Sequence, residues 1–318
     1  MFLKTKSKLR PQIIINPESD KGRTGKRWQQ IKEALRSFFR EFRYEFTEKP
    51  CHATEISRTA IKDGTELIVG IGGDGTMNEI ANGFFEGDRI INPDTSLGVV
   101  PSGTGSDFSR SLLIPLSYRK ALELIAQVPS RTIDAGRVKF MDHEGRICER
   151  YFLNISDFGI GGEVVRHMRL NQMKRKKSSY LLSTLATFLH YKNKRLRISV
   201  DGRELPEEEY MIGAIANGRI FGKGMKIAPE ARLDDGLFDV VLIKGMKILE
   251  FLRNVRRVYA GTHLSHPKIE FLRGTRVEVT PAEEQKGGVL IEVDGEQVGQ
   301  APVVFEMLPG CIPVKANL

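Results

Sequence analysis

The stretch Leu67–Thr76, LIVGIGGDGT, joins an apolar run to a turn that holds three glycines, one carboxylate and one hydroxyl. The apolar run predicts a buried strand over 67–71, and the apolar spacing that follows predicts a helix over 77–85. Glycines let a main chain approach a bulky anion and aim successive N–H groups at it, and a helix start adds its positive dipole end. The stretch therefore predicts a strand–turn–helix unit that binds nucleotide phosphates, although it contains no Walker A motif. A purely structural tight turn is the alternative.

Strand and helix patterns alternate around this unit over residues 11–135. The predicted strands are 12–17, 44–47, 67–71 and 96–100, and the predicted helices are 28–42, 53–62 and 77–85. Such alternation is typical of an α/β domain with a doubly wound parallel sheet, in which ligands bind at the carboxyl ends of the strands. Two further turns rich in glycine or hydroxyl groups, Asn16–Gly22 and Pro101–Phe108, follow strands and fall on that edge.

From about Thr132 the pattern changes to short strand-like runs, interrupted by helical stretches near 164–191 and at 248–259. The runs are 137–140, 150–155, 196–200, 209–216, 237–243, 276–281, 289–293 and 303–308. Runs of this length predict a mostly antiparallel β-sandwich. We therefore expect a nucleotide-binding α/β domain over 1–133 and a β-sandwich domain over 134–305.

The bulk properties are those of a globular protein of 318 residues with a net charge of +9. The chain begins with a basic stretch that lacks a signal-peptide apolar region, and its longest lipid-like stretch, 180–191, is too short to span a membrane. The three cysteines, Cys51, Cys148 and Cys311, are scattered and form no CxxC pair. These features predict a reduced, cytoplasmic protein without a structural zinc site.

The positive charge is concentrated between Glu163 and Asp201, a window with ten cations and no acidic residue. The cations are Arg166, Arg169, Lys174, Arg175, Lys176, Lys177, Lys192, Lys194, Arg195 and Arg197. Apolar side chains within 180–189 lie between two cationic blocks, which is typical of a helix at a membrane interface. Each cation near an anionic leaflet contributes roughly 1 kcal/mol. The 166–197 region therefore predicts binding to an anionic membrane surface, with a solvated charged face as the alternative. No recognition motif favours nucleic acid as a partner.

The motifs as a set resemble those of the bacterial lipid kinases related to diacylglycerol kinase. The likeness runs over essentially the whole chain and rests on Asn16–Ser19, Gly72–Thr76, Pro101–Phe108, Asp234–Leu237 and Val293–Glu296. Eukaryotic diacylglycerol, sphingosine and ceramide kinases share the catalytic domain of this family, and NAD kinases are more distant relatives. The resemblance implies a two-domain fold with ATP at the inter-domain cleft, a second domain that receives the lipid, and a tail, 306–318, that rejoins the first domain.

The resemblance also implies the residues that contact the nucleotide. They are Asn16, Thr47, Gly72, Gly73, Asp74, Gly75, Thr76 and Thr104. Their hydroxyls and backbone amides are suited to donate hydrogen bonds to phosphate oxygens. One departure is visible, because this chain has Ser106 where many members have asparagine, so the side-chain amide is lost.

A magnesium site is implied at Asp234-Asp235-Gly236, which on composition alone is a hairpin turn. In the family the corresponding acid binds Mg²⁺ together with two backbone carbonyls, which here are those of Arg232 and Leu237 beside Asp235. Hard oxygen ligands with several waters suit Mg²⁺. The resemblance makes this ion structural and separate from any Mg²⁺ that binds with ATP.

The catalytic turn implied by the resemblance is Asp294-Gly295-Glu296. Phosphoryl transfer to an alcohol needs a carboxylate to accept the hydroxyl proton while cations neutralise the developing charge. Glu296 is the first candidate for this base. Asp294 is the second, either as base or as organiser of the magnesium–water network, and Asp74 is the third. The sequence alone does not separate them.

The sequence therefore predicts an ATP- and Mg²⁺-dependent lipid kinase that is cytoplasmic and peripheral at the inner face of the membrane. Diacylglycerol, converted to phosphatidic acid, is the default substrate; phosphatidylglycerol, a sphingoid base or an isoprenoid alcohol is the alternative. NAD kinase, which shares the GGDGT motif, is a second alternative. A non-catalytic nucleotide or lipid sensor is a third, against which the intact acids at 74, 235, 294 and 296 argue. A homodimer is left open.

Overall fold

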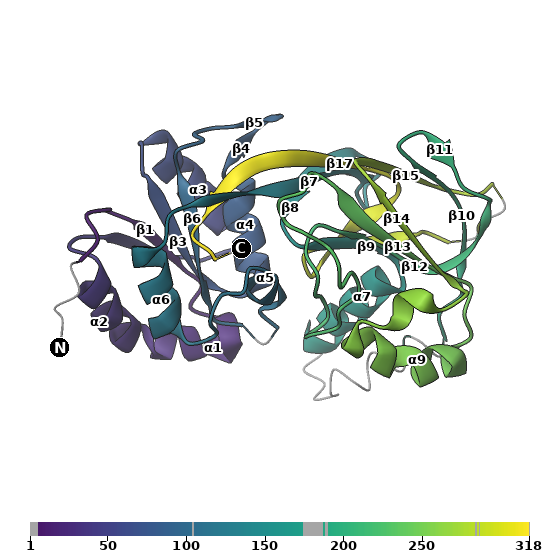
Figure 1. The fold of residues 1–318 in the computed structure, drawn as a ribbon, viewed down its shortest axis with the longest axis horizontal. Coiled ribbons are helices and arrows are strands. Elements are labelled where there is room, and N and C mark those ends of the chain that lie inside the picture. The colour runs from purple at the N-terminus through teal and green to yellow at the C-terminus, as the bar shows by residue number, and fades with distance from the viewer. Residues whose placement is uncertain are drawn as a thin grey trace. The chain divides into compact units, whose positions relative to one another are not determined.

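The computed structural model describes residues 6–103, 105–173, 187, 190–283, 285 and 287–317. The chain divides into two compact units (Figure 1). Unit 1 comprises residues 1–135 and 309–318, and unit 2 comprises residues 136–308. Strands β7 (Arg131–Met141) and β17 (Glu296–Val314) each run from one unit into the other. The tail of the chain therefore belongs to the unit that contains the glycine-rich turns.

Unit 1 is built on a parallel sheet in the order β2 (Arg43–Phe46), β1 (Gln12–Ile15), β3 (Leu67–Gly72) and β6 (Ser96–Pro101). The end of β17 pairs in parallel with β6. Strands β1, β3 and β6 are buried along their whole length. Burial on both faces explains why they read as continuous apolar runs.

Helices connect these strands and pack in pairs, α2 against α6 and α3 against α4. The helices are α1 (Ser19–Lys26), α2 (Trp28–Phe38), α3 (His52–Lys62), α4 (Asp74–Asn82), α5 (Asp107–Ser111) and α6 (Tyr118–Gln127). A small hairpin of β4 (Phe85–Glu86) and β5 (Arg89–Ile90) follows α4. Helix α4 packs closely on β3 at Gly70, where a Cβ atom would lie 2.5 Å from Ile80 Cδ1 and would displace the ends of the Ile80 and Met77 side chains. The doubly wound placement of the helices on the sheet stays a prediction.

Several predicted bounds in unit 1 are corrected. The helix expected over 28–42 ends at Phe38, because Phe39 is extended and fully buried. The helix expected over 77–85 begins earlier, at Asp74, and Phe85 starts β4. Helices α1, α5 and α6 were not predicted. Within α1, residues Asp20, Lys21 and Gly22 have left-handed backbone angles. The sequence therefore lacks the regular helical spacing that would predict this helix.

Unit 2 is rich in β-structure, as predicted, and its described strands β8 to β16 pair with their neighbours in antiparallel fashion. Besides parts of β7 and β17, its strands are β8 (Ile147–Phe152), β9 (Ile155–Gly159), β10 (Lys194–Val200), β11 (Arg203–Glu204), β12 (Glu208–Ala216), β13 (Phe238–Lys244), β14 (Ile269–Gly274), β15 (Arg276–Pro281) and β16 (Leu290–Val293). Its helical elements are α7 (Ile160–Met173), α9 (Ile248–Ala260) and the 3-10 helix η1 (His263–Ser265).

Two apolar clusters stabilise unit 2. One contains Phe152, Phe158, Phe238 and Phe305 and consists mainly of residues on the strands. The other includes the alternate residues Ile212, Ala214 and Ala216 of β12, which it joins to α7 and α9, with the buried Val258 from α9. The alternation follows from the period of two along a strand, which sends successive side chains to opposite faces. Both faces of β12 are therefore covered.

The predictions for unit 2 need three corrections. The run 150–155 is two strands, β8 and β9, which are separated at Leu153–Asn154. Strands β11 and β14 were missed, and β17 extends well beyond the expected 303–308. The helix expected at 248–259 is confirmed as α9. Of the stretch near 164–191, α7 covers the beginning, and most of 174–189 lies outside the described residues. Within the described part of the chain, no helix combines the length and apolar character needed to cross a membrane.

Replacing Phe152 by alanine should destabilise unit 2. Phe152 is fully buried, and its ring stacks on that of Phe238 with 5.6 Å between centroids. We expect the free energy of unfolding to fall by about 3–5 kcal/mol, because the substitution removes apolar contacts and leaves a cavity. Urea denaturation followed by circular dichroism measures this change. The control is Ile147→Ala, at a side chain that is 83% exposed, and should change stability by about 0.5 kcal/mol or less. Equal effects of the two substitutions would contradict the packing described.

Candidate functional site

The glycine-rich turns that follow β3 and β6 touch each other. The N–H of Ser102 donates to the carbonyl of Gly72 at 2.8 Å. A Cβ atom at Gly103 would lie 2.8 Å from the Cα of Gly73, so the two backbones can approach this closely only with glycine at 103. The structure thus brings together two turns that the sequence singled out separately, at the carboxyl edge of the parallel sheet.

The turn that follows β1 joins the same group. Asn16 Nδ2 donates to Thr76 Oγ1 at 3.0 Å, which connects this turn to the first turn of α4. The Thr24 hydroxyl lies 2.6 Å from Ser19 Oγ and also bonds to the Ser102 hydroxyl. Thr24, a residue that the sequence analysis did not select, therefore connects the turns after β1 and β6.

Of the remaining residues predicted to contact the nucleotide, two lie at the same edge of the sheet and one is outside the described residues. Thr47 directly follows β2, and its N–H donates to the carbonyl of Ile15 at 2.8 Å. Gly75 belongs to the first turn of α4. Thr104 lies outside the described residues.

The start of α4 has the features of an anion site. The helix begins at Asp74, its N-cap residue is Gly73, and no side chain caps its first N–H groups. Because the first N–H groups of a helix have no partner within it, they remain available to an anionic ligand, and the helix dipole favours negative charge there. This arrangement suits a phosphate group next to the side chains of Asn16 and Thr76.

Asp74 has both carboxylate oxygens occupied by backbone donors. Its Oδ2 accepts the N–H of Asp107, and its Oδ1 accepts the N–H of Phe108, each at 3.1 Å. It therefore caps α5 from another segment. Burial raises the pKa of the Asp74 carboxyl, and the bonds from Phe108 and Asp107 offset part of this effect. The geometry gives Asp74 a structural role in joining the two glycine-rich turns.

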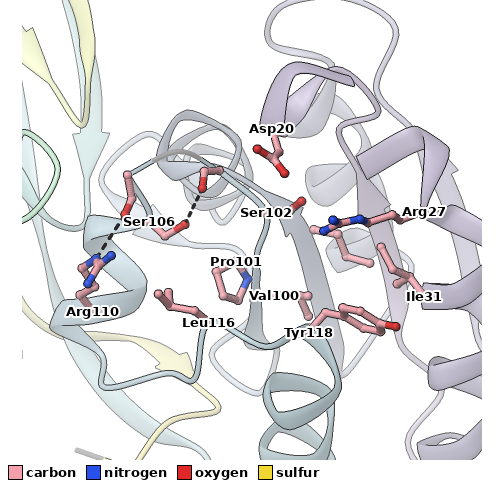
Figure 2. Close-up of a pocket in the computed structure, with 13 residues that line it drawn as sticks. Asp20, Arg27, Ile31, Val100, Pro101, Ser102, Ser106, Arg110, Leu116 and Tyr118 are labelled. Atoms are coloured by element: carbon pink, nitrogen blue, oxygen red, sulfur yellow. Dashed lines mark hydrogen bonds between the residues drawn. The ribbon is translucent and has the colours of Figure 1, made fainter. Parts of the chain in front are cut away.

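A cavity of about 300 Å³ lies beside these turns within unit 1 (Figure 2). Val100, Ile31 and Leu116 supply apolar walls, and Arg27 and Arg110 lie on different sides of the cavity. Arg110 Nε donates to the carbonyl of Gly105 at 3.3 Å. Apolar walls combined with guanidinium groups suit a ligand that has both an apolar part and negative charge.

The predicted magnesium turn lies directly before β13. Asp235 Oδ1 accepts the N–H of Leu237 at 3.2 Å, and the side chain makes no other hydrogen bond to the described residues. Arg232 Nε donates to the neighbouring Asp234 at 3.3 Å. No group of three or more His, Cys, Asp or Glu side chains that could hold a metal occurs in the part of the chain that the structure describes. The second carboxylate oxygen of Asp235 accepts no hydrogen bond from the described residues and lies on a turn with main-chain carbonyls. Such a set of oxygens fits a Mg²⁺ ion that keeps several waters.

Asp294 is deeply committed to the backbone. It lies in the turn between β16 and β17, is buried, and has a left-handed φ of 44°. Its Oδ2 accepts the N–H of Leu153 at 2.9 Å, and its Oδ1 accepts those of Asn154 and Ile155 at 3.1 and 3.0 Å. These bonds satisfy the donors at the break between β8 and β9, which explains why the predicted single strand divides there.

Glu296 differs from the other two candidate acids. It is the first residue of β17, and its side chain is 41% exposed. Its Oε2 accepts a hydrogen bond from Arg150 Nη2 at 2.7 Å, an ionic contact that orients the carboxylate. Among the described residues, no backbone N–H occupies it. Of the three acids, Glu296 is therefore the one whose carboxylate is held by a side chain and not by backbone N–H groups in the described part of the chain.

A buried carboxyl pair lies beneath this turn. Asp157 on β9 and Glu292 on β16 are cross-strand neighbours with 1% and 6% exposure. Glu292 accepts the N–H of Gly295, and neither oxygen of Asp157 has a hydrogen-bond partner among the described residues. Burial raises the pKa of Asp157 to about 6 and that of Glu292 well above its usual range, the latter with a contribution from the Asp157 charge. An acid inside an apolar strand was the sequence signal for each, and the sequence analysis did not use it.

The described cations of the 166–197 region are partly paired. Arg166 Nη2 lies 2.8 Å from Glu163, and Arg195 Nε lies 2.8 Å from Glu207. Lys192 and Arg197 are exposed. Arg169 lies on α7, but its side chain is not among the described parts of the structure. The four cations at 174–177 also lie outside the described residues. The interfacial helix predicted around 180–189 is therefore not addressed by the structure.

Two family models match the chain in succession. The diacylglycerol kinase catalytic domain matches residues 10–138, and the YegS C-terminal NAD kinase beta sandwich-like domain matches residues 155–316. The chain belongs to the diacylglycerol kinase-like family. It is accordingly a lipid kinase, an enzyme that phosphorylates an alcohol group.

Individual relatives extend this finding. A diacylglycerol kinase of Staphylococcus carnosus is 27% identical over 306 residues, which cover 93% of this chain and 91% of the relative. A putative diacylglycerol kinase from Bacillus anthracis has a similar structure, with a TM-score of 0.78, 23% identity and coverage of 100% and 98%. An NAD kinase from Archaeoglobus fulgidus, in complex with ATP, gives a TM-score of 0.50 at 16% identity, with coverage of 97% and 94%. The two structural likenesses show the fold of the kinase.

Replacing Asp294 by asparagine should destabilise the kinase. In the parent chain, three backbone N–H groups share the two oxygens of Asp294. The asparagine amide keeps only one acceptor oxygen for them. We expect the free energy of unfolding to fall by about 1–3 kcal/mol, because buried donors lose their partners. Urea denaturation measures this loss. Glu296→Gln is the matched control and should cost about 1 kcal/mol or less, since its ion pair is partly exposed. A silent Asp294→Asn would refute the structural role.

Replacing Glu292 by glutamine should stabilise the kinase at alkaline pH. The pKa of Glu292 is raised in the folded chain, so the pair favours folding below about pH 4 and loses that contribution as the pH rises through the folded pKa values. Glutamine needs no proton and still offers an oxygen to Gly295. We expect the free energy of unfolding to exceed that of the parent chain by about 1–3 kcal/mol near pH 8 and to equal it near pH 4. Urea denaturation at both pH values measures the difference. An equal change at the two pH values would count against a raised pKa.

Proposed function

We propose that this kinase transfers the γ-phosphate of ATP to the hydroxyl of diacylglycerol, giving phosphatidic acid. The observation that carries the proposal is the assembly of three phosphate-suited turns at one edge of the parallel sheet. The contact of Gly103 with Gly73 and the bond from Asn16 to Thr76 hold these turns together. The relatives named diacylglycerol kinase support the choice of lipid.

We infer that the phosphates of ATP bind at the start of α4. Backbone N–H groups of residues 72–76 and the hydroxyls of Thr76 and Thr47 would donate to their oxygens, and Thr104 would add another hydroxyl. The positive dipole end of α4 adds to this attraction. We propose that Asp74 serves the site by holding the start of α5 beside it.

Mg²⁺ bound with ATP supplies positive charge that neutralises the phosphoryl oxygens during transfer. We propose that a second, structural ion is held by Asp235 with the carbonyls of Arg232 and Leu237. The oxygen donors and the uncommitted half of the Asp235 carboxylate support this assignment.

Glu296 is the proposed general base. A base must accept the alcohol proton as the oxygen attacks the γ-phosphorus, and it must therefore be accessible and unprotonated. Its exposure and the ionic contact with Arg150 support this role. Asp294 is then assigned to holding the turn on which Glu296 is carried, because its oxygens are occupied.

We propose that unit 2 receives the lipid and that the kinase acts in the cytoplasm, peripherally at the inner face of the membrane. The basic 166–197 region supports attraction to an anionic membrane surface. Homodimerisation stays a prediction. NAD phosphorylation is the second candidate, because the fold is shared with an NAD kinase.

Glu296→Gln should abolish most kinase activity. The substitution removes the proton acceptor, so we expect kcat to fall by roughly 10²–10⁴-fold, with the KM for ATP little changed. The assay follows labelled γ-phosphate from Mg-ATP into diacylglycerol, phosphatidylglycerol, sphingosine, undecaprenol or NAD. Glu204→Gln, at an exposed acid on β11, is the matched control and should retain activity.

Each outcome of this assay has a defined meaning. Label in diacylglycerol that is lost in Glu296→Gln supports the proposed reaction and the proposed base. Label only in another lipid or in NAD overturns the substrate. Full activity of Glu296→Gln overturns the base, and label in no acceptor overturns the reaction as proposed.

A further inference from the structure

Helix α9 exposes apolar and cationic side chains together on one face. Leu249 is 65% exposed, Leu252 41% and Tyr259 47%. Arg253 and Arg256 are also exposed. With 3.6 residues per turn, these five side chains fall within an arc of roughly 120° around the helix axis. We call them the α9 surface.

The opposite face of α9 anchors the helix to unit 2. Val258 is buried in the apolar cluster that α9 shares with β12 and α7, and Phe251 packs against the same cluster. Arg257, unlike its neighbours Arg253 and Arg256, is used internally and donates to the Thr262 carbonyl at 3.0 Å. The inner face is therefore fully used, and the α9 surface is a separate, outward feature of a firmly packed helix.

The charge of the α9 surface is positive and uncompensated within the described residues. Neither Arg253 nor Arg256 forms an ion pair or hydrogen bond there. The acid of the helix, Glu250, is occupied by Lys268 Nζ at 2.7 Å and lies near His266. The surface thus combines accessible apolar groups with free cations and lacks an acidic member.

We propose that the α9 surface docks the kinase onto an anionic phospholipid bilayer, with its leucines inserted among the lipids and its arginines against the headgroups. This inference rests on the proposed function and adds to it α9 as an element that contacts the membrane besides the basic 166–197 region. Scattered exposed leucines need no explanation, but apolar residues grouped with free cations on a polar helix are the pattern of an interfacial helix. Arginine stems lie along apolar surface while their heads reach the phosphates.

Charge complementarity favours a lipid surface over a second copy of this chain. A self-complementary interface would place the α9 arginines of one copy opposite those of the other or against an acidic patch, and the α9 surface offers no acid to receive them. A bilayer with anionic headgroups compensates both cations and accepts all the exposed apolar groups.

Vesicle binding tests the α9 surface directly. The full chain is sedimented with vesicles of phosphatidylcholine, with and without phosphatidylglycerol. Two double variants remove one chemistry each: Arg253→Gln with Arg256→Gln, and Leu249→Ser with Leu252→Ser. The matched controls are Arg203→Gln and Ile147→Ser, at exposed residues of unit 2 away from α9.

We expect the arginine variant to bind anionic vesicles about 30-fold more weakly, at roughly fivefold per cation, and the leucine variant roughly tenfold more weakly. The controls should bind like the parent chain. Unchanged binding of both double variants overturns the proposal, as does equal binding of the parent to neutral and anionic vesicles. Light scattering adds a further check: a dimer that the leucine variant converts to monomer makes this face an interface between copies and overturns docking.

A second measurement separates this inference from the proposed function. The same variants are assayed on a short-chain diacylglycerol dissolved as monomers. A docking surface predicts unchanged kcat on the soluble substrate and reduced activity on vesicles, whereas a loss on both overturns the docking role. If the parent phosphorylates no soluble or vesicular diacylglycerol, the proposed function fails, while the vesicle-binding result still decides the docking surface.

Discussion

Hydrogen bonds from backbone N–H groups to two carboxylates, Asp74 and Asp294, hold together the segments on which the proposed site depends. Asp74 joins the turn after β3 to the start of α5, and Asp294 joins the β16–β17 turn to the break between β8 and β9. Hydrogen bonds to a charged acceptor are stronger than neutral ones, and a buried donor without a partner is costly. Each carboxylate therefore fixes two segments that are distant in sequence.

The same commitment decides how the acids divide their roles. An oxygen that already accepts two N–H groups is poorly placed to take a proton during a reaction, because protonation would break the bonds that hold the turn. Asp294 lies two residues from Glu296, yet the first has its oxygens in the backbone network and the second is exposed beside Arg150. Two neighbouring acids of similar chemistry thus differ in their hydrogen bonds. Those of Asp294 stabilise the turn, and those of Glu296 leave it as the proposed base.

Much of this arrangement could be predicted from the sequence, and the failures have physical causes. The strands β1, β3 and β6 were visible because burial on both faces demands continuous apolar runs, and the motif positions placed their turns on one edge. The contact of Gly73 with Gly103 was not visible, because it depends on how two loops approach in space. Helix α1 was missed because its left-handed residues break the period, and the division of β8 from β9 was missed because a distant carboxylate causes it.

The buried pair of Asp157 and Glu292 shows why an apolar strand carries an acid beneath the proposed base. Two charged carboxylates at this burial would repel and lack solvation, so the pair retains a proton, as the raised pKa of each indicates. Glu292 can accept the Gly295 N–H even when it carries the proton, because a protonated carboxyl group keeps an acceptor oxygen. The turn that carries Glu296 is thereby held by Glu292 on β16 and by Asp294 within the turn, and the retained proton leaves the buried pair with one negative charge instead of two. An apolar residue at 292 would leave the Gly295 donor without this acceptor, which is a reason for the strand to carry an acid despite the cost of burying it.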